Sequence, residues 1–402
     1  MVNARGNITT QVFDALNRLQ ATQDALNNRT TYGYDKVGNR NYIQDPAGYY
    51  VTMSYDGRRS LLSMQDQNAY TTSYTYDQIG RKSTRQTALG DLTTYSYDRE
   101  NRIASTAYAD ATVYTYGYDA NSNLTTATDV VGSITFTYDQ LDRITGRTDP
   151  GSLSQAYSYD KVGNKLTLKD PDSRIRTLSY DSSSRLTTAI TPDGAMNTWL
   201  YDSLNRVVTI QQSSPTFTYH YNYDKTGNIT SLQNYDLNGT FALGFTYTYD
   251  PNNNRLTLRD SSGTITTYAY DAVDRLTQDS TVGLNTHTYS YTYDSRGNMT
   301  YNSETGTFSY DAGNRKVTGT ISNSLSTFTY DHNGNMTGVN EAVALTMLNY
   351  DKENRLSAHF DAGGTVTTNI YDPLGKKRAW AKSTGTRSTI VWDGEDYVQV
   401  RE

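Results

Sequence analysis

The stretch Tyr157-Ser158-Tyr159-Asp160-Lys161-Val162-Gly163-Asn164 contains the features that decide the fold. Two tyrosines alternate with a small serine, which is the period-2 pattern of a strand with one aromatic face. Asp160 then opens a turn, because its carboxylate can accept hydrogen bonds from backbone N–H groups two residues further on. Gly163 tolerates a positive φ, as a three-residue hairpin loop built on a type I turn requires. The stretch therefore predicts a strand that ends in a tight hairpin turn.

The same pattern recurs along the whole chain. An aromatic residue followed by Asp occurs in 19 in-phase copies, from Phe13 to Trp392, and most copies are 20 or 21 residues apart. The residue three positions after the Asp is Gly, Asn or Asp in 16 of these copies. About ten residues after the Asp a second turn signal appears, for example Asp45-Pro46-Ala47-Gly48. One copy is thus strand, turn, strand, turn, so the 19 copies predict about 38 strands in one meandering antiparallel sheet.

The composition supports an all-β class and excludes several functions. The 402 residues include 61 Thr, 37 Tyr and 36 Asp but only 6 Glu, so strand and turn formers outnumber helix formers. The absence of cysteine excludes disulfides, Cys-based zinc sites and a thiol nucleophile. A net charge of −6 without a basic run disfavours nucleic acid as a partner. No apolar stretch approaches the ~20 residues of a membrane-spanning helix.

The repeat resembles a known family. The signature Tyr-x-Tyr-Asp-x-x-Gly-Asn quoted above, together with Tyr350-Asp351-Lys352-Glu353-Asn354-Arg355-Leu356, resembles the YD repeats of Rhs proteins. Similar repeats build the shells of teneurins and of the B and C components of bacterial Tc toxins. The resemblance covers essentially the whole chain. It implies a spiral β-sheet that encloses a toxic polypeptide in a secreted or cell-surface bacterial protein. The partners it implies are the remainder of a longer Rhs-type shell and an encapsulated C-terminal toxin.

We expect residues 1–402 to form a single array of about 19 repeats that curls into a spiral shell or barrel segment. The spacing is irregular between residues 221 and 310, where an out-of-register pair, Tyr235-Asp236, precedes an apolar stretch from Phe241 to Phe245. This stretch is expected to be a plug, a contact surface or a repair of imperfect repeats. Beyond the last YD units, the family resemblance implies a core-closing region and a toxin. The chain has neither, so we expect a segment that is truncated at both ends relative to a full shell.

The repeat positions are the candidate functional residues, and their predicted role is structural. The Asp of each pair is expected to open a turn and not to act in catalysis. The Arg four residues later, as in Arg143, is expected to pair with neighbouring turn carboxylates, and the alternative is binding of phosphate or acidic cargo. The rings are expected to pack on one another, and the alternative is binding of sugars or extended peptide. The assigned positions are Tyr34, Asp35, Gly38, Tyr76, Asp77, Gly80, Tyr97, Asp98, Arg102, Tyr159, Asp160, Gly163, Tyr201, Asp202, Arg206, Tyr293, Asp294, Gly297, Tyr350, Asp351 and Arg355.

The sequence predicts no catalytic residue, no metal ligand and no cofactor. The histidines at positions 220, 287, 332 and 359 have no metal-ligand spacing. Neither a Gly-x-Ser-x-Gly elbow nor a phosphate-binding Gly-Lys-Ser/Thr loop occurs. We therefore expect a non-enzymatic shell segment that walls a cavity around a toxin or another polypeptide. The alternative is a surface-exposed carbohydrate-binding or adhesive repeat array, for which glycans would be partners and the binding residues are not assigned.

Overall fold

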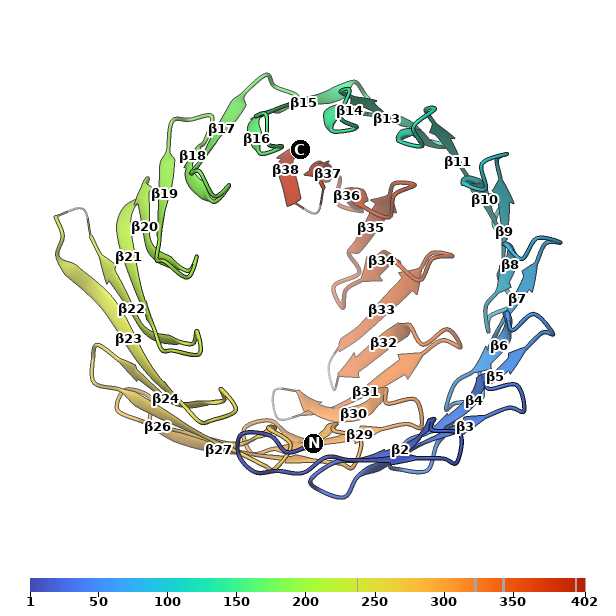
Figure 1. Cartoon of the computed structure of the whole chain (residues 1–402), viewed down its shortest axis with the longest axis horizontal. Helices are drawn as coiled ribbons and strands as arrows, with labels where there is room; N and C mark the ends of the chain where they lie inside the picture. The colour runs from blue at the N-terminus through green and yellow to red at the C-terminus, as the bar shows by residue number, and fades with distance from the viewer. Residues whose placement is uncertain (237, 322–323, 342–343, 395, 402) are drawn as a thin grey trace. The chain divides into compact units, whose positions relative to one another are not determined.

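The computed structural model describes residues 1–236, 238–321, 324–341, 344–394 and 396–401. These residues form 38 strands, two per repeat, and no helix. Consecutive strands pair antiparallel along the chain in a single sheet (Figure 1). The predicted all-β fold of tandem hairpins is therefore confirmed. Among the described residues the first and last strands do not pair, so hydrogen bonds do not close the sheet into a barrel.

The first third of the sheet comprises β1 (Thr10–Phe13), β2 (Leu19–Gln23), β3 (Arg29–Tyr34), β4 (Arg40–Gln44), β5 (Tyr50–Tyr55), β6 (Leu61–Gln65), β7 (Thr71–Tyr76), β8 (Lys82–Gln86), β9 (Leu92–Tyr97), β10 (Ile103–Tyr108), β11 (Val113–Tyr118) and β12 (Leu124–Asp129). It continues with β13 (Gly132–Tyr138), β14 (Ile144–Asp149), β15 (Leu153–Tyr159), β16 (Lys165–Lys169), β17 (Ile175–Tyr180), β18 (Leu186–Ile190), β19 (Met196–Tyr201), β20 (Val207–Ser213), β21 (Thr216–Tyr223), β22 (Ile229–Tyr235), β23 (Phe241–Tyr249), β24 (Arg255–Asp260), β25 (Ile265–Tyr270) and β26 (Leu276–Val282). The last strands are β27 (His287–Tyr293), β28 (Met299–Asn302), β29 (Gly306–Tyr310), β30 (Lys316–Ile321), β31 (Ser324–Tyr330), β32 (Met336–Glu341), β33 (Ala344–Tyr350), β34 (Leu356–Phe360), β35 (Val366–Tyr371), β36 (Lys377–Lys382), β37 (Arg387–Asp393) and β38 (Asp396–Arg401).

Two kinds of turn alternate between these strands. A YD turn, which runs from the Asp of the repeat to the fourth residue after it, joins an odd-numbered strand to the next strand. A return turn joins an even-numbered strand to the odd-numbered strand that follows. The two kinds therefore lie at opposite ends of the strands.

The YD turn has one recurring backbone geometry. In the turn that begins at Asp98, the N–H of Asp98 donates to the carbonyl of Arg102 (2.9 Å), and the N–H of Asn101 donates back to the carbonyl of Asp98 (3.2 Å). Asn101 has a φ of +66°, which explains the preference for Gly, Asn and Asp at this position. The register then shifts by one residue at a β-bulge beside Ile103. The turn predicted from the Asp-x-x-Gly/Asn pattern is therefore the turn that forms.

The irregular region contains hairpins of unequal length and no inserted element among its described residues. The step of 26 residues from Tyr223 to Tyr249 reflects β22 and β23, which are seven and nine residues long. The apolar stretch from Phe241 to Phe245 lies in β23 and pairs with β22. Asp236 opens the return turn between these strands, because its Oδ1 accepts the N–H of Thr240 (2.8 Å). The apolar stretch is part of the sheet, so the expectation of a plug is wrong; residue 237 lies outside the described residues.

The chain divides into two compact units. Unit 1 comprises Ile8–Thr135 and Tyr291–Glu402 with Met1, and unit 2 comprises Phe136–Ser290 with Val2–Asn7. Within unit 1 the two segments, blue to teal and orange to red in Figure 1, meet through their turns. No helix in the described ranges is long and apolar enough to cross a membrane.

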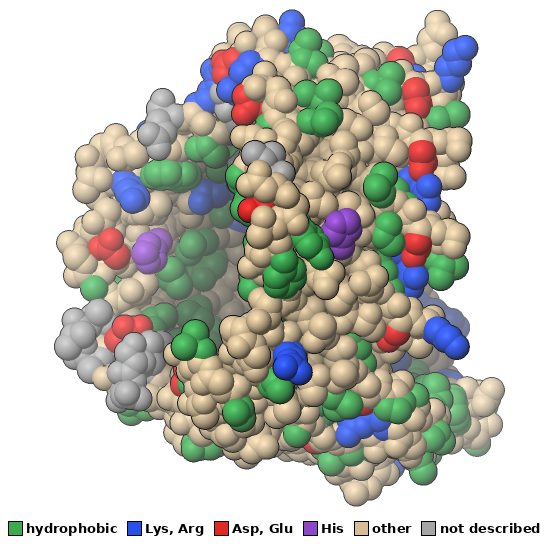
Figure 2. Space-filling model, turned by 90° about the vertical axis from the view of Figure 1, so that its left-hand side faces the viewer, with side chains coloured by type: hydrophobic (Ala, Val, Ile, Leu, Met, Phe, Trp, Pro, Cys, Tyr) green, Lys and Arg blue, Asp and Glu red, His purple; other side chains and the backbone are tan. Residues whose placement is uncertain are grey.

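One face of the sheet carries the register aromatics, which are the aromatic residues immediately before each Asp, and the other face carries hydroxyl groups. Hydroxyls on neighbouring strands bond to each other across this second face, as in Ser96–Ser105 (2.6 Å) and Thr248–Thr257 (2.7 Å). Figure 2 shows mostly uncharged polar side chains and backbone, with hydrophobic and charged side chains scattered among them. Threonine is frequent on this second face, although some threonines, such as Thr93 and Thr106, lie on the aromatic face.

Candidate functional site: the YD lattice and the seam of unit 1

The register aromatics are anchored to backbone carbonyl groups. The hydroxyl of Tyr97 donates to the carbonyl of Lys82 (2.8 Å), the first residue of β8. Backbone pairing between β8 and β9 reaches only Thr84 and Thr94 at this end. The hydroxyl therefore ties together the strand ends that the ladder leaves open. The same bond to the first residue of the neighbouring strand is made by Tyr34, Tyr55, Tyr76, Tyr118, Tyr159, Tyr201, Tyr223, Tyr249, Tyr270, Tyr310, Tyr330 and Tyr371, and by the indole N–H of Trp392.

A guanidinium group from the preceding repeat covers many of these rings. The Cζ of Arg81 lies 4.5 Å from the ring centroid of Tyr97. The Nε of Arg81 also donates to Asp77 (2.6 Å), and its Nη1 donates to Asn101 (2.7 Å). One Arg thus joins its own turn, the next ring and the next turn. Equivalent cation–π contacts cover the rings of Tyr34, Tyr118, Tyr159, Tyr201, Tyr223, Tyr330 and Tyr371.

The expected packing of rings on one another is found for some aromatic residues, such as Tyr108 and Tyr114 (ring centroids 5.2 Å apart), but not between register aromatics. Among the described residues, none of the ring–ring pairs joins two register aromatics. Consecutive register rings lie two strands apart, which is about 9.6 Å. This distance exceeds the ~4.5–7 Å between centroids at which aromatic rings interact. The space next to a register ring is occupied instead by the Arg side chain that ends the preceding YD turn, as Arg81 does at Tyr97.

The Asp carboxylate is fully engaged in its own turn. The Oδ1 of Asp202 accepts the N–H groups of Leu204 and Arg206 (both 2.9 Å), and its Oδ2 accepts the Nε of Arg206 (2.7 Å). In other repeats an Asn amide replaces the guanidinium, as in Asp35 with Asn39 (2.8 Å). The Arg that was expected to pair with neighbouring turns therefore pairs first with its own turn.

These hydrogen bonds stabilise the charged form of the carboxylates. The side-chain and backbone hydrogen bonds from Arg185 hold the pKa of Asp181 below its usual value. The hydroxyl of Thr226 is the largest of several donors that lower the pKa of Asp224 to about 2. An ionised carboxylate that is saturated with donors is a poor general base, because it has little tendency to take up a proton.

The remaining assigned positions lie in the same turn geometry. Asp77, Asp98, Asp160, Asp294 and Asp351 each accept the backbone N–H groups of the second and fourth residues after them. Gly38, Gly80, Gly163 and Gly297 have φ values of +93°, +88°, +101° and +91°. Arg102 and Arg355 donate from Nε to the carboxylates of their own turns at 2.7 Å. Tyr293 and Tyr350 end β27 and β33.

A further feature of unit 1 is absent from the repeat pattern. YD turns of its second segment dock on return turns of its first segment, and we call this contact the seam. The seam consists of return turns 45–49, 66–70, 87–91, 108–112 and 129–132 and of YD turns 294–298, 311–315, 331–335, 351–355 and 372–376. Three ion pairs cross the seam: Asp45–Arg296 (3.3 Å), Asp91–Lys352 (2.8 Å) and Asp129–Arg378 (3.1 Å). Four hydrogen bonds also cross it: Gly313 N–H to Asn68 (3.2 Å), Leu89 N–H to Asn333 (3.3 Å), Arg355 to the Tyr114 hydroxyl (3.2 Å) and the Tyr116 hydroxyl to the Pro373 carbonyl (3.1 Å). The ring of Tyr70 stacks on that of His332, with 4.5 Å between the ring centroids. The two rows of turns are staggered: return turn 66–70 contacts YD turns 311–315 and 331–335, and return turn 87–91 contacts YD turns 331–335 and 351–355.

Charged groups cluster at the middle of the seam. Glu353 approaches Arg85 at 3.3 Å, and burial together with the charge of Glu353 strongly raises the pKa of Tyr108. The hydrogen bond from Lys352 to Asp91 raises the pKa of that lysine. At one end of the seam, the side chains of Arg378 and Asp129 are only 9% and 4% exposed. Loss of one partner from so buried a pair would leave an uncompensated charge, which costs about 3–5 kcal/mol.

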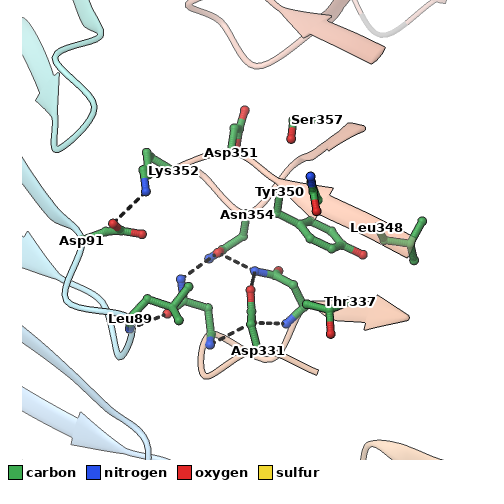
Figure 3. Close-up of a pocket in the computed structure, with 13 residues that line it drawn as sticks. Leu89, Asp91, Asp331, Thr337, Leu348, Tyr350, Asp351, Lys352, Asn354 and Ser357 are labelled. Atoms are coloured by element: carbon green, nitrogen blue, oxygen red, sulfur yellow. Dashed lines mark hydrogen bonds and ion pairs between the residues drawn. The ribbon is translucent and has the colours of Figure 1, made fainter. Parts of the chain in front are cut away.

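A cavity of about 380 Å³ lies at the seam and is shown in Figure 3. Lys352 reaches across one side of it to Asp91. The ring of Tyr350 and the side chain of Leu348 line another side. Its remaining lining is mainly Asp and Asn from YD turns, whose polar atoms bond to one another. Among the described residues no group of three or more His, Asp or Glu side chains is arranged to hold a metal ion.

Tandem YD hairpins in one continuous sheet define the chain as a YD-repeat shell protein. It belongs to the Teneurin YD-shell family, whose model matches residues 17–222 and 196–393. Comparison with curated proteins gives no significant match.

Solved structures of Tc toxin components have the same fold. The crystal structure of TcdB2-TccC3-Cdc42 matches with a TM-score of 0.71 and 16% identity over 96% of this chain and 25% of that chain. TcdB2-TccC3-TEV gives 0.71 and 15% over 98% and 25%. The Tc holotoxin pore of Photorhabdus luminescens gives 0.61 and 16% over 98% and 25%. The chain thus spans about a quarter of the length of the solved chains that it matches.

The seam residues were missed by the sequence analysis. Arg296, Asn333 and Glu353 each stand two residues after the Asp of a YD turn, where repeats such as those with Val37 and Ile79 carry an aliphatic residue. The residue type at this position is no signal for the seam, because Arg58 and Glu100 are polar in exposed turns whereas Leu374 is aliphatic in a seam turn. It does not identify the partner turns, because these lie more than 240 residues away.

Proposed function

We propose that this chain is a non-enzymatic wall segment of a YD shell and that, together with further shell, it encloses a polypeptide cargo. The observation that carries the proposal is the uninterrupted antiparallel sheet of YD hairpins over all 19 repeats. Membership of the Teneurin YD-shell family and the fold shared with Tc toxin structures support it. The resemblance to Rhs proteins adds a toxic polypeptide as the expected cargo.

The polar side chains of the YD turns are engaged in hydrogen bonds within and between the turns, which supports a structural role. Each YD carboxylate bonds to backbone N–H groups and to the Arg or Asn of its turn, as in Asp202 with Arg206. The same arrangement recurs at nearly every repeat, whereas a catalytic site needs one residue in a unique environment. We therefore assign no catalytic residue and no cofactor.

The partners in this proposal are the remainder of a longer shell and its cargo. The chain spans about a quarter of the solved chains with this fold. We propose that residues 1–402 act as one array of repeats and that cavity closure requires additional YD hairpins.

Limited proteolysis of the full-length gene product tests the enclosure of cargo. We expect a polypeptide that resists protease in the native protein and becomes sensitive when the shell is opened. Asp129→Ala opens the seam at its buried ion pair and should expose the cargo, while Asp193→Ala, in an exposed return turn, should not. If mass spectrometry finds no protected polypeptide in the native full-length protein, the enclosure proposal is wrong.

A carbohydrate-binding or adhesive array remains the second candidate, and the cavity in Figure 3 favours it. A Tyr350 ring beside Asp331, Asp351 and Asn354 is the kind of lining that binds a sugar. Against it, the polar atoms of these residues already bond within their turns, as in Asp331 with Asn335 (2.8 Å). Glycan-array binding that is lost in Tyr350→Ala would establish this candidate, and the absence of binding would remove it.

A further inference from the structure

A second cavity, of about 230 Å³, lies at the seam. The first segment of unit 1 lines it with side chains of β6, β7 and β8 and of the return turns that follow β6 and β8. The second segment contributes His332, Asn333 and Asn354 from two YD turns. Asn333 and Asn354 also line the cavity in Figure 3, so the two cavities are neighbours. We call the second one the Thr87 cavity.

Thr87 brings a buried hydroxyl group to this cavity. It opens return turn 87–91, at a position where many return turns have Asp, and it is only 7% exposed. Thr191 opens turn 191–195 with the same backbone hydrogen bonds, and its hydroxyl donates to the carbonyl of Ala195 (2.9 Å). The hydroxyl of Thr87 makes no hydrogen bond to any described residue. A buried hydroxyl without a partner costs free energy, so a ligand atom that bonds to it would be favoured here.

Arg85 brings a guanidinium group with one free nitrogen. Its Nη2 donates to the carbonyl of Lys352 and to the carboxylate of Glu353, both at 3.3 Å. Its Nη1 bonds to no described residue, and neither does the hydroxyl of Tyr74, which faces Arg85 across the β7–β8 pair. The lining therefore has a charged donor beside a hydroxyl that can donate or accept.

Asp66 brings a carboxylate oxygen that is also free. Its Oδ1 accepts the N–H groups of Asn68 and Tyr70 (both 2.9 Å) and so holds the return turn in shape. Its Oδ2 accepts no hydrogen bond from the part of the chain that the structure describes. Asp66 follows β6 and Arg85 lies in β8, so β7 separates them. The lining thus has a free anionic acceptor on one side of β7 and a free cationic donor on the other.

These charges select among small ligands. Glu353 already pairs with Arg85, so a ligand that is only an anion would meet two carboxylates, those of Glu353 and Asp66. A ligand that is only a cation would meet the guanidinium of Arg85. A small zwitterion can place each charge beside its opposite in a charge-assisted hydrogen bond. Pockets for drug-sized ligands have about 300–1,000 Å³, so the smaller volume here suits a molecule of amino-acid size.

We propose that the Thr87 cavity binds a free amino acid. Its carboxylate accepts hydrogen bonds from the Nη1 of Arg85 and the hydroxyl of Thr87, its ammonium group donates to the Oδ2 of Asp66, and its side chain packs against Met64 and Tyr70. Both segments line the cavity, so the bound amino acid would also stabilise the seam. This inference goes beyond the proposed function, because a wall segment needs no small ligand and the proteolysis test of enclosure does not depend on one.

Isothermal titration calorimetry on the full 402-residue chain tests the proposal with glycine, L-alanine and L-leucine. Propionate, ethylammonium and methyl glucoside are the comparison compounds, which carry only the anion, only the cation or only hydroxyl groups. At least one amino acid should bind, and each comparison compound should bind about tenfold more weakly or not at all, because it lacks at least one charge-assisted bond. The same amino acid should raise the melting temperature of the chain.

Two variants remove the proposed contacts while keeping the turns. Asp66→Asn keeps an acceptor for the turn, as Asn3 shows when its Oδ1 accepts the N–H of Asn7 (2.8 Å), and should weaken binding about tenfold. Thr87→Val removes only the unpartnered hydroxyl, so it should weaken binding about threefold without lowering the melting temperature. The matched control is Thr191→Val, which loses a bond within its own turn and should lower the stability while leaving binding unchanged.

Failure of all three amino acids to bind the native chain would overturn the proposal. So would a comparison compound that binds as tightly as the best amino acid, because the two charges would then not be used together. Cavity variants that bind like the native chain would place the ligand elsewhere and overturn it as well. Binding that is lost in Tyr350→Ala but kept in Thr87→Val would assign the ligand to the cavity in Figure 3 instead.

Discussion

The hydroxyl-to-carbonyl bond of the register tyrosines allows a sharp test of what holds the sheet together. Tyr97→Phe removes only the bond from the Tyr97 hydroxyl to the carbonyl of Lys82 and leaves the ring under Arg81. Such a bond contributes about 0.5–1.5 kcal/mol. The free energy of local opening should therefore fall by about 1 kcal/mol, which raises the open population roughly fivefold. Tyr97→Ala also removes ring packing and the cation–π contact, for a total of about 2–3 kcal/mol and roughly a hundredfold increase.

Hydrogen–deuterium exchange read by mass spectrometry measures these changes locally. Amides of β8 and β9 should exchange faster in both variants, whereas those of the distant β25 should not change, because each repeat contacts mainly its neighbours. Tyr42→Phe is the matched control. Tyr42 lies outside the register, packs edge-on against Tyr50 at 5.5 Å, and its hydroxyl bonds to none of the described residues. If Tyr97→Phe and Tyr42→Phe have equal effects, the hydroxyl bond does not hold the strand ends.

Two other measurements test the turns and the seam. Hydrogen bonds lower the folded-state pKa values of Asp139, Asp181 and Asp202, and that of Asp224 lies at about 2. The ionised carboxylates therefore stabilise the fold fully at a pH above the unfolded-state pKa of about 3.9. This stabilisation is lost as the pH falls through the folded-state pKa values. We expect circular dichroism melts to be steady down to about pH 5 and to weaken from about pH 4 toward 2, and weakening above pH 5 would count against this assignment. Since the chain has no cysteine, Asn68→Cys with Gly313→Cys should form a disulfide across the seam on oxidation, seen as a mobility shift, whereas Gly57→Cys with Gly313→Cys should not.

The sequence predicted the local structure well because each repeat encodes it within about ten residues. Asp98 marks the turn, Asn101 takes the positive φ, and the alternation before Tyr97 marks the strand. For the apolar stretch at Phe241 the sequence left a plug, a contact surface and a repair of imperfect repeats open, since an apolar run does not by itself distinguish a longer strand from an insertion.

The seam lay beyond prediction for a physical reason. Leu89 and Asn333 meet across 244 residues, and which turns meet at such a separation depends on small rotations between neighbouring strands summed over many strands. No motif encodes that sum. The contacts between register rings were mispredicted for a simpler reason: successive rings in the sequence look adjacent, although another strand separates them.

The shortage of aliphatic residues follows from how the repeats use Arg. In the described residues, eight register rings lie under a guanidinium group, and each of these eight follows a YD turn that ends in Arg. Where the turn ends in Asn, the amide cannot reach the next ring and bonds to the next turn instead, as Asn164 does to Ser184 (3.2 Å). The chain thus mixes ring-covering and turn-linking repeats, and neither kind needs a continuous aliphatic core. Because these contacts join neighbouring hairpins, each added repeat stabilises the next, which is why a sheet of 38 strands can form from so few buried aliphatic side chains.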